Sequence, residues 1–281
     1  SRALFKIAVE LGAVTHMLAA VHEIDDDTMI IGTSGRYEFK NKGINVYLEA
    51  LNRLTRDKNL KKDVLAFINV PGWVGEVRED LRERLDSGKD YDTPLECPFI
   101  THWLHNMSHD QVLDMLKHLN MSNSVDTKVK VVFVPCYLDG KDGILNELYY
   151  DLLIGTDLSV YPSYYEPWGY TPLESIAFKV PTITTDLAGF GLWVNSLTGK
   201  NATLQDGVKV IHRTDYNYSE VADTIKDTIS EFSSLTSTEI NKIRKNAANI
   251  AEKALWKHFI QYYYEAYDIA LRNAAKRLSL N

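Results

Sequence analysis

The sequence predicts an α/β fold: a parallel sheet with helices on both faces, followed by a C-terminal helical segment. Short apolar or β-branched runs alternate with longer stretches of helical periodicity, which is typical of βα units. Several runs lack polar alternation, as expected for strands that helices cover on both sides. After Arg213 the pattern is wholly helical. Six strands are predicted, at Met29–Thr33, Val64–Val70, Val129–Pro135, Leu158–Tyr161, Thr182–Thr185 and Val208–His212.

Helical periodicity marks the segments between and after these strands. Between strands, helices are predicted near Gly43–Leu54, Asp110–Leu119, Ile144–Ile154 and Pro172–Phe178. Ser219–Phe232 and Thr238–Leu255 follow, the second just after the capping-type residue Ser237. The last helix carries an aromatic stripe that is more typical of packing than of a cofactor site, comprising Trp256, Phe259, Tyr263, Tyr267 and Ala270. We therefore expect a sheet domain over residues 1–214, with the helices of residues 215–281 packing on it as part of the same domain.

Composition and charge exclude several classes of protein. The chain has 281 residues, 45% hydrophobic and 25% charged, which suits one large α/β domain or two small ones. Two cysteines are too few for a disulfide framework and indicate a reducing compartment. The net charge of −7 argues against nucleic acid as a partner. No signal peptide is visible and no apolar run approaches the roughly 20 residues of a membrane span, so we expect a soluble, cytoplasmic protein.

One stretch, Gly75–Pro98, is charged and contains no strand pattern. It is predicted to form a short helix and a loop, inserted between two βα units. We expect its charged side chains to face solvent, because charge runs usually form a solvated surface.

The segment from Tyr161 to Glu174 carries the most chemistry, and it follows a predicted strand directly. In open α/β sheets, ligands bind beyond the carboxyl ends of the strands. Thr171 to Glu174 has the form of a capping box, with Pro172 at the first helical position. A helix that starts there directs its free N–H groups and positive dipole end toward the loop, which suits a phosphate.

Two carboxylates and a glycine complete this loop. Gly169 permits close backbone approach, and Glu166 and Glu174 can accept hydrogen bonds from sugar hydroxyls. The alternative is purely structural: Glu174 only caps the helix, while the neighbouring prolines and tryptophan stiffen the loop. Local sequence alone leaves both interpretations open.

A second loop, Thr33–Gly43, also follows an apolar strand. Gly35 allows the backbone to turn, and Arg36 and Lys42 place two cations in one loop, a common pairing for pyrophosphate. A solvated loop is the alternative. A third loop, Thr184–Gly191, offers two glycines at another strand end, although a plain turn would have the same sequence. The first two loops, as candidate phosphate sites at strand ends of one sheet, reinforce each other.

Four residues of the run THWLHNMSHD have spacings compatible with a metal site, namely His102, His105, His109 and Asp110. The alternative is that they are polar loop and helix-cap residues. We favour this alternative and predict no metal site.

Three of these stretches, SGRYEFKNKG, PSYYEPWGYTP and TTDLAGFG, resemble signatures of the glycogen (starch) synthases of the animal and fungal type. These are retaining glycosyltransferases of the GT-B fold, with two Rossmann-like domains that face each other across a cleft. The resemblance runs from about Met29 to about Val194, and more thinly through the C-terminal helices. It therefore covers the C-terminal, nucleotide-sugar-binding domain, and the N-terminal acceptor domain is absent from this sequence.

The resemblance implies roles for the charged residues. Arg36 and Lys42 match the cations that hold the donor diphosphate and support the departing nucleotide. Glu166 matches the glutamate that contacts the transferred glucose, and Glu174 matches the one that binds ribose hydroxyls.

The remaining site residues are implied in the same way. Gly169, Tyr170 and Thr171 match the turn that meets the phosphates. Tyr149 resembles the aromatic residue that stacks on uracil, on the basis of its spacing before Glu166. Tyr150 is the competing choice, and either tyrosine can instead be a core residue.

The reaction implied is retaining transfer of glucose from UDP-glucose to the 4-hydroxyl of an α-1,4-glucan, without a metal or other cofactor. The acceptor binds through the missing domain, so this chain alone is expected to be inactive. The short segment Gly75–Pro98 leaves family-type tetramers in doubt, although the full-length protein can still form a homo-oligomer. The predicted helix Thr238–Leu255 lacks the dense arginine cluster through which family members respond to glucose 6-phosphate, so this regulation is not predicted.

Alternatives to this enzyme remain open. One is a related glucosyltransferase that uses another donor, such as ADP-glucose. Another is a non-catalytic nucleotide-sugar or carbohydrate-binding module. A phosphorylase-like enzyme would share the architecture but needs pyridoxal phosphate bound to a lysine, which we do not expect.

Overall fold

The computed structural model describes residues 28–87, 89, 95–124 and 126–278. The first 27 residues of the predicted sheet domain, and residues 88 and 90–94 of the charged segment, lie outside the described residues. The main sheet has six strands, all paired in parallel. They are β1 (Met29–Ser34), β2 (Val64–Asn69), β5 (Val129–Val134), β6 (Leu158–Val160), β7 (Thr182–Thr185) and β8 (Val208–Ile211). All six predicted strands are confirmed, with ends that agree within one residue.

The strand order is β5-β2-β1-β6-β7-β8. Numbered along the chain, these strands give the order 3-2-1-4-5-6, which is that of a Rossmann-like fold. The order reverses between β1 and β6, so their carboxyl ends border the crevice where such folds bind ligands. At the opposite end of this seam the Ile30 amide donates to the Asp157 carboxylate at 3.0 Å, and the two residues are 127 positions apart in the chain.

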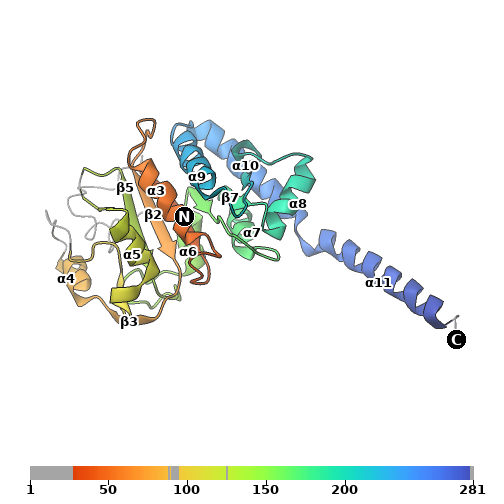
Figure 1. Cartoon of the computed structure of the whole chain (residues 1–281), viewed down its shortest axis with the longest axis horizontal. Helices are drawn as coiled ribbons and strands as arrows, with labels where there is room; N and C mark the ends of the chain where they lie inside the picture. Colours follow the sequence, from red (N-terminus) through yellow and green to blue (C-terminus); the bar gives the residue numbers. More distant parts are fainter. Residues whose placement is uncertain (1–27, 88, 90–94, 125, 279–281) are drawn as a thin grey trace.

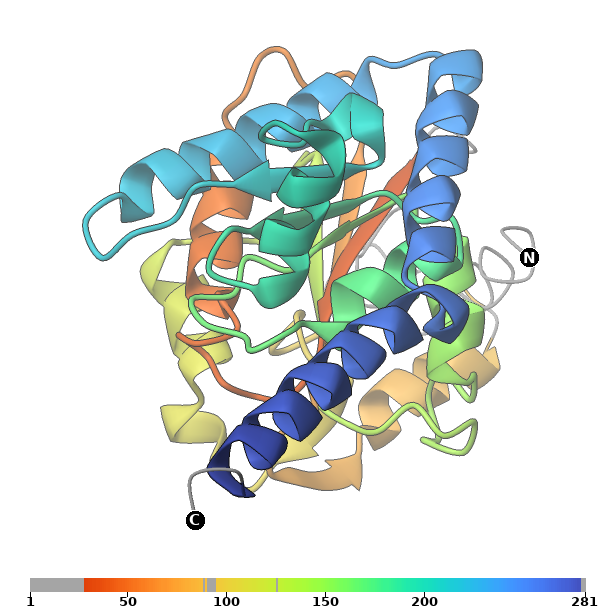
Figure 2. The ribbon, with the colours of Figure 1, turned by 90° about the vertical axis from the view of Figure 1, so that its right-hand side faces the viewer.

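Helices cover both faces of the sheet, as predicted (Figures 1 and 2). On one face, α3 (Ile44–Leu54), α5 (Gln111–His118) and α9 (Tyr218–Ser233) share an apolar core with alternate strand residues such as Ile31 and Phe133. On the other face, Ile30 and Phe67 pack with residues of α4 (Glu79–Ser87) and α6 (Tyr149–Gly155). A third cluster joins β8 to α7 (Tyr170–Ala177), α8 (Gly189–Thr198) and α10 (Ser237–Lys253).

The C-terminal helices differ in how they meet the sheet domain. α9 packs on α3, and α10 packs on α7. α10 begins after a capping box in which Thr236 and Glu239 bond each other's backbone amides. α11 (Trp256–Leu278) instead runs away from the rest of the chain (Figure 1), and none of its residues is buried.

The aromatic stripe that the sequence assigned to packing lies mostly in solvent. Near the start of α11, the Phe259 ring lies 5.5 Å from the ring of Trp168 and 5.4 Å from that of Trp193. Tyr263 contacts Trp256, the first residue of α11, and also Tyr267 farther along; all three side chains are about half exposed or more. The helices α9 and α10 and the start of α11 therefore contact residues of the sheet domain. None of the described helices is both long and apolar enough to cross a membrane.

The helix predicted at Ile144–Ile154 begins five residues later, at Tyr149. The Asp142 carboxylate accepts hydrogen bonds from the amides of residues 144, 145 and 146, which holds this segment as a turn. Gly143 and Asn146 both have positive φ, a backbone conformation that ends helical periodicity. Ile144 and Leu145 are therefore apolar because they pack into the core from a loop, and not because they belong to a helix.

The charged segment is less solvated than predicted. β3 (Val74–Val77) pairs with β4 (His102–Leu104) in a two-stranded antiparallel sheet. Arg78 is fully buried, and its guanidinium lies 4.4 Å from the centre of the Trp103 ring. The guanidinium donates to the backbone carbonyls of Glu96, Cys97 and Ile100 and pairs with the Asp80 carboxylate. A buried charge is tolerated here because its donors find partners.

Candidate functional site

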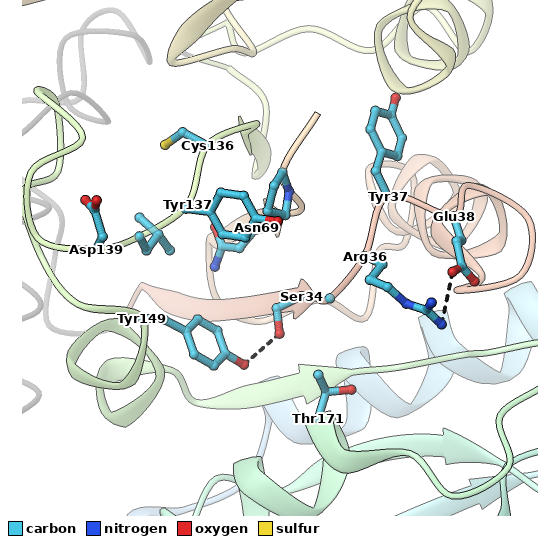
Figure 3. A pocket seen from close by; sticks show the side chains of 13 residues that line it. Ser34, Arg36, Tyr37, Glu38, Asn69, Cys136, Tyr137, Asp139, Tyr149 and Thr171 are labelled. Atoms are coloured by element: carbon cyan, nitrogen blue, oxygen red, sulfur yellow. Dashed lines mark hydrogen bonds and ion pairs between the residues drawn. The ribbon is translucent and has the colours of Figure 1, made fainter. Parts of the chain in front are cut away.

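The carboxyl ends of β1, β2 and β5 border a cavity of about 740 Å³ (Figure 3). Its wall comprises residues 34–38 after β1, Asn69 and Pro71 at the end of β2, and residues 136–139 after β5. Tyr149 at the start of α6 and Thr171 at the start of α7 complete it. A volume in this range accommodates a nucleotide-sized ligand.

Tyr149 is held in the cavity wall by hydrogen bonds. Its backbone amide donates to the Leu138 carbonyl at 3.2 Å, and its hydroxyl lies 2.6 Å from the Ser34 hydroxyl. Burial raises the pKa of the Tyr149 hydroxyl, with a further contribution from Tyr161, so this group is neutral. Tyr150 is 45% exposed, and its ring lies 5.2 Å from that of Phe178, outside the cavity lining. Of the two tyrosines, the structure therefore places Tyr149 in the cavity.

Arg36 reaches the cavity from the loop after β1. Its side chain is 75% exposed, and it pairs with the Glu38 carboxylate at 3.0 Å (Figure 3). Such an exposed pair is worth little in stability. The guanidinium is therefore free to exchange Glu38 for an anionic ligand at small cost.

Lys42 belongs to the same loop but lies outside the cavity lining, where it pairs with Glu166. The side chains are 14% and 12% exposed, and the ammonium contacts one Glu166 oxygen directly. Burial lowers the pKa of Lys42, and positive Arg36 adds to this effect while Glu38 opposes it. The adjacent Glu166 carboxylate favours the charged ammonium, so we take Lys42 to be charged at neutral pH.

All three strand-end loops predicted from the sequence meet here. Lys42 of the first loop contacts Glu166 of the second. The Glu166 amide donates to the carbonyl of Leu187 in the third loop, and the Gly189 amide donates back to the Glu166 carbonyl. A Cβ at Gly189 would lie 2.2 Å from the Pro167 carbonyl oxygen, so the third loop needs glycine at this position.

The capping box predicted at Thr171 is wrong. Gly169 is the N-cap residue, with φ +103°, and α7 begins at Tyr170 without a side-chain cap. Thr171 is the second residue of the helix and lines the cavity, whereas Tyr170 is 72% exposed. Glycine at the cap favours this turn because side chains rarely adopt such a φ. The first-turn amides of α7 consequently receive no hydrogen bond acceptor from the cap side chain.

Glu174 lies in the second turn of α7, where burial raises its pKa and a hydrogen bond from Tyr150 opposes that shift. The folded state therefore holds a proton on Glu174 at pH values where the unfolded chain has lost it, and stability falls as pH rises through this window. We expect Glu174→Gln, which never ionises, to gain stability relative to the wild type between about pH 4 and pH 7. Urea unfolding at both pH values measures this, and a pH-independent difference would contradict it.

Sequence reasoning missed the part of the cavity lining that follows β2 and β5, which includes Asn69 and Tyr137. Tyr137 is 77% exposed and follows β5 in the same way that Arg36 follows β1. Asn69 is the last residue of β2. The rule that ligands bind beyond strand ends, applied to β2 and β5 as well, would have identified both.

The suggested metal ligands do not gather with one another. His102 instead lies near Cys136 and Asp142, with the possible ligand atoms within 4.8 Å of each other. Both His102 ring nitrogens are already hydrogen-bonded, to Thr101 and to the Asp142 carbonyl. Asp110 is the N-cap of α5, bonding the amides of Val112 and Leu113. These contacts assign structural roles to His102 and Asp110.

A family model described as glycogen synthase matches residues 81–278 of this chain. The match covers well over half of the sequence. This chain belongs to the glycogen synthase family. The three signature loops that suggested the family from sequence are the loops that meet around Lys42 and Glu166.

Known glycogen synthases extend beyond the region this chain covers. Glycogen [starch] synthase isoform 1 of Saccharomyces cerevisiae is 26% identical over 308 aligned positions, covering 89% of this chain and 44% of the yeast protein. The Caenorhabditis elegans glycogen [starch] synthase is 27% identical, covering 88% of this chain and 44% of its own length. The chain thus spans less than half of these relatives. A crystallised glycosyltransferase from Rickettsia africae aligns with 89% of this chain and 50% of its own, at 17% identity and a TM-score of 0.46.

Proposed function

We propose that this chain is the donor-binding part of a glycogen synthase that uses UDP-glucose. In the full-length enzyme it would support retaining transfer of glucose to the 4-hydroxyl of an α-1,4-glucan. The observation that carries the proposal is that Arg36, Thr171 and Tyr149 line one cavity, at the switch point of the sheet. That arrangement provides a cation, a helix start and an aromatic ring for one ligand.

Each part of UDP-glucose has a matching group in this proposal. Arg36 and the first turn of α7 bind the diphosphate, with Lys42 as a second cation. Tyr149 stacks on the uracil, and Glu174 accepts hydrogen bonds from the ribose. Gly169 and Tyr170 form the turn that lets the phosphates approach the backbone.

The Lys42–Glu166 pair would act at the glucose end. Both side chains are largely shielded from solvent, so their charges act through a medium of lower dielectric than water. Lys42 and Arg36 would stabilise the negative charge that develops on the departing UDP, and Glu166 would orient the glucose. Catalysis would then rest on fixed charges, without a metal or other cofactor. The acceptor glucan would bind through the half of the protein that this chain does not cover, so this chain alone would be inactive.

Isothermal titration of this chain with UDP, UDP-glucose, ADP-glucose and GDP-mannose tests the proposal. We expect UDP and UDP-glucose to bind and the other two donors to bind at least tenfold more weakly. A clear preference for ADP-glucose or GDP-mannose would reject uridine as the donor nucleotide. Absence of binding to all four would reject the donor site itself.

A pair of substitutions separates Tyr149 from Tyr150. We expect Tyr149→Ala to weaken UDP binding by about 1–3 kcal/mol, the scale of base stacking on an aromatic ring. Tyr150→Ala is the comparison variant: it removes the same side chain from the neighbouring position outside the cavity, together with its hydrogen bond to Glu174, and we expect a smaller loss from it. Titration of UDP into both variants measures the difference. A larger loss from Tyr150→Ala would transfer the stacking role to Tyr150.

A further inference from the structure

Asn69 is a polar residue of the cavity wall, and the proposed donor site gives it no role. It ends β2, and the strand register pairs it with Ser34 of β1. Its side chain lines the same cavity as Tyr137 and Tyr149. Figure 3 shows it between Tyr137 and the hydrogen-bonded pair of Ser34 and Tyr149. The amide is therefore beside the ring that would stack on the base.

One polar atom of the Asn69 side chain also lacks a partner. Its Oδ1 atom is buried, yet it has no hydrogen bond within the described part of the chain. The nearest hydroxyl in register, that of Ser34, is already bonded to Tyr149. Buried amide oxygens are rarely left unpaired in folded proteins, because they lose hydrogen bonds to water without replacement. A ligand or a bound water must satisfy this amide.

A bound water alone is the competing explanation. A second, much smaller void of about 10 Å³ lies under the end of β1 and is bordered by Ser34, Asn69 and Tyr149. That volume is at the lower limit for a single water molecule. A water there would satisfy Asn69 without any role in ligand recognition.

We propose that Asn69 reads the edge of the donor nucleobase. This inference rests on the proposed function, since it assumes that a nucleotide occupies the cavity. A carboxamide presents an acceptor next to donors. Uracil presents N3–H next to its O4 carbonyl, which is the complementary pattern. Stacking on Tyr149 accepts any base because every base has a π-face. Asn69 would supply the polar contact that stacking cannot.

Two variants and three probes test this. Asn69→Leu removes the polar atoms at similar volume, and Asn69→Asp keeps the shape but removes the donor group. Asn201→Leu, at an exposed position outside the cavity lining, is the control. The probes are UDP, UDP methylated at uracil N3, and inorganic pyrophosphate, which has no base. Isothermal titration gives each affinity, and urea unfolding identifies any variant that fails to fold.

We expect Asn69→Leu and Asn69→Asp to weaken UDP binding about tenfold, the scale of a lost hydrogen bond in a buried site. Pyrophosphate affinity should stay within about twofold of the wild type. N3 methylation should weaken binding to the wild type and cost less in Asn69→Leu, because the acceptor for N3–H is already gone there. In Asn69→Asp the carboxylate can still accept from N3–H, so the cost of methylation should remain. Asn201→Leu should match the wild type with all three probes.

Several results would overturn the inference. Unchanged UDP affinity in the variants would assign Asn69 to the bound water. An equal loss of UDP and pyrophosphate would show that Asn69 only supports the fold of the site. If Asn69→Leu does not fold, Asn69→Asp decides on the same criteria, and failure of both to fold would assign a structural role. Wild type that does not bind UDP would reject the proposed function and this inference together, whereas loss of the Asn69 effect alone leaves the proposed function standing.

Discussion

Replacing Gly43 with alanine is expected to destabilise the fold by at least about 3 kcal/mol, through overpacking and backbone strain together. Gly43 has φ +70°, and a Cβ there would lie 2.0 Å from the Pro162 carbonyl oxygen. The same Cβ would lie 2.9 Å from the Arg213 guanidinium, which donates a hydrogen bond to the Pro162 carbonyl. Backbone, carbonyl and arginine fix one another, so none can move to make room. Urea unfolding of the wild type and the variant measures the effect.

Gly199→Ala is the matched control for Gly43→Ala. Gly199 also has positive φ, at +65°, but nothing lies within 4 Å of its added Cβ. This control should cost only about 1 kcal/mol, the expense of the left-handed backbone. Equal losses for the two variants would show that the loops at Gly43 and Pro162 are loosely packed. Because Lys42 precedes Gly43, we expect Gly43→Ala to weaken UDP binding as well.

Arg36→Ala is expected to weaken UDP binding by about 1.5–3 kcal/mol, or roughly 10- to 150-fold, the scale of a charge-assisted hydrogen bond. The guanidinium lines the cavity and is otherwise paired with Glu38 only at the surface. The effect should shrink as salt is added, because exposed charges are screened. Isothermal titration at low and high salt measures both quantities.

Arg56→Ala controls for the loss of a surface arginine. Arg56 is exposed and follows the last turn of α3, at the amino edge of the sheet away from the cavity. It should leave UDP affinity unchanged. Stability should be nearly unaffected in both variants, since neither side chain is buried. If Arg36→Ala binds UDP as well as the wild type, the loop after β1 is not the diphosphate site.

Most of the fold could be predicted because strands buried on both faces have a local signature. The six parallel strands were found within one residue of their ends, for example Thr182–Thr185. β3 and β4 were missed because they are short and lie in polar sequence. Burial of Arg78 could not be foreseen, since its carbonyl partners lie 18 to 22 residues farther along the chain. The extent to which α11 is exposed could not be derived from its own sequence, because an amphipathic pattern does not identify the surface that it packs against.

The candidate site was partly predictable for a related reason. Strand-end loops are visible in sequence, and the sequence therefore predicts that Arg36, Glu166 and Thr171 belong to one site. The direct contact between Lys42 and Glu166 joins residues 124 positions apart and depends on the strand order. Asn69 and Tyr137 were overlooked because their strands carry no motif beyond apolar residues. The start of α7 differs from the prediction because Thr171 and Glu174 have the spacing of a capping box, although the N-cap is Gly169, two residues before Thr171.

The seam between β1 and β6 has a consequence for how this chain acquires its structure. The bond from Ile30 to Asp157 cannot form until more than a hundred intervening residues have been synthesised or collapsed. Sheets that depend on such distant pairings fold slowly, and their unpaired strand edges stay open to other chains in the meantime. During biosynthesis β1 therefore cannot pair with β6 until that strand has been made. We expect the yield on refolding to depend strongly on protein concentration.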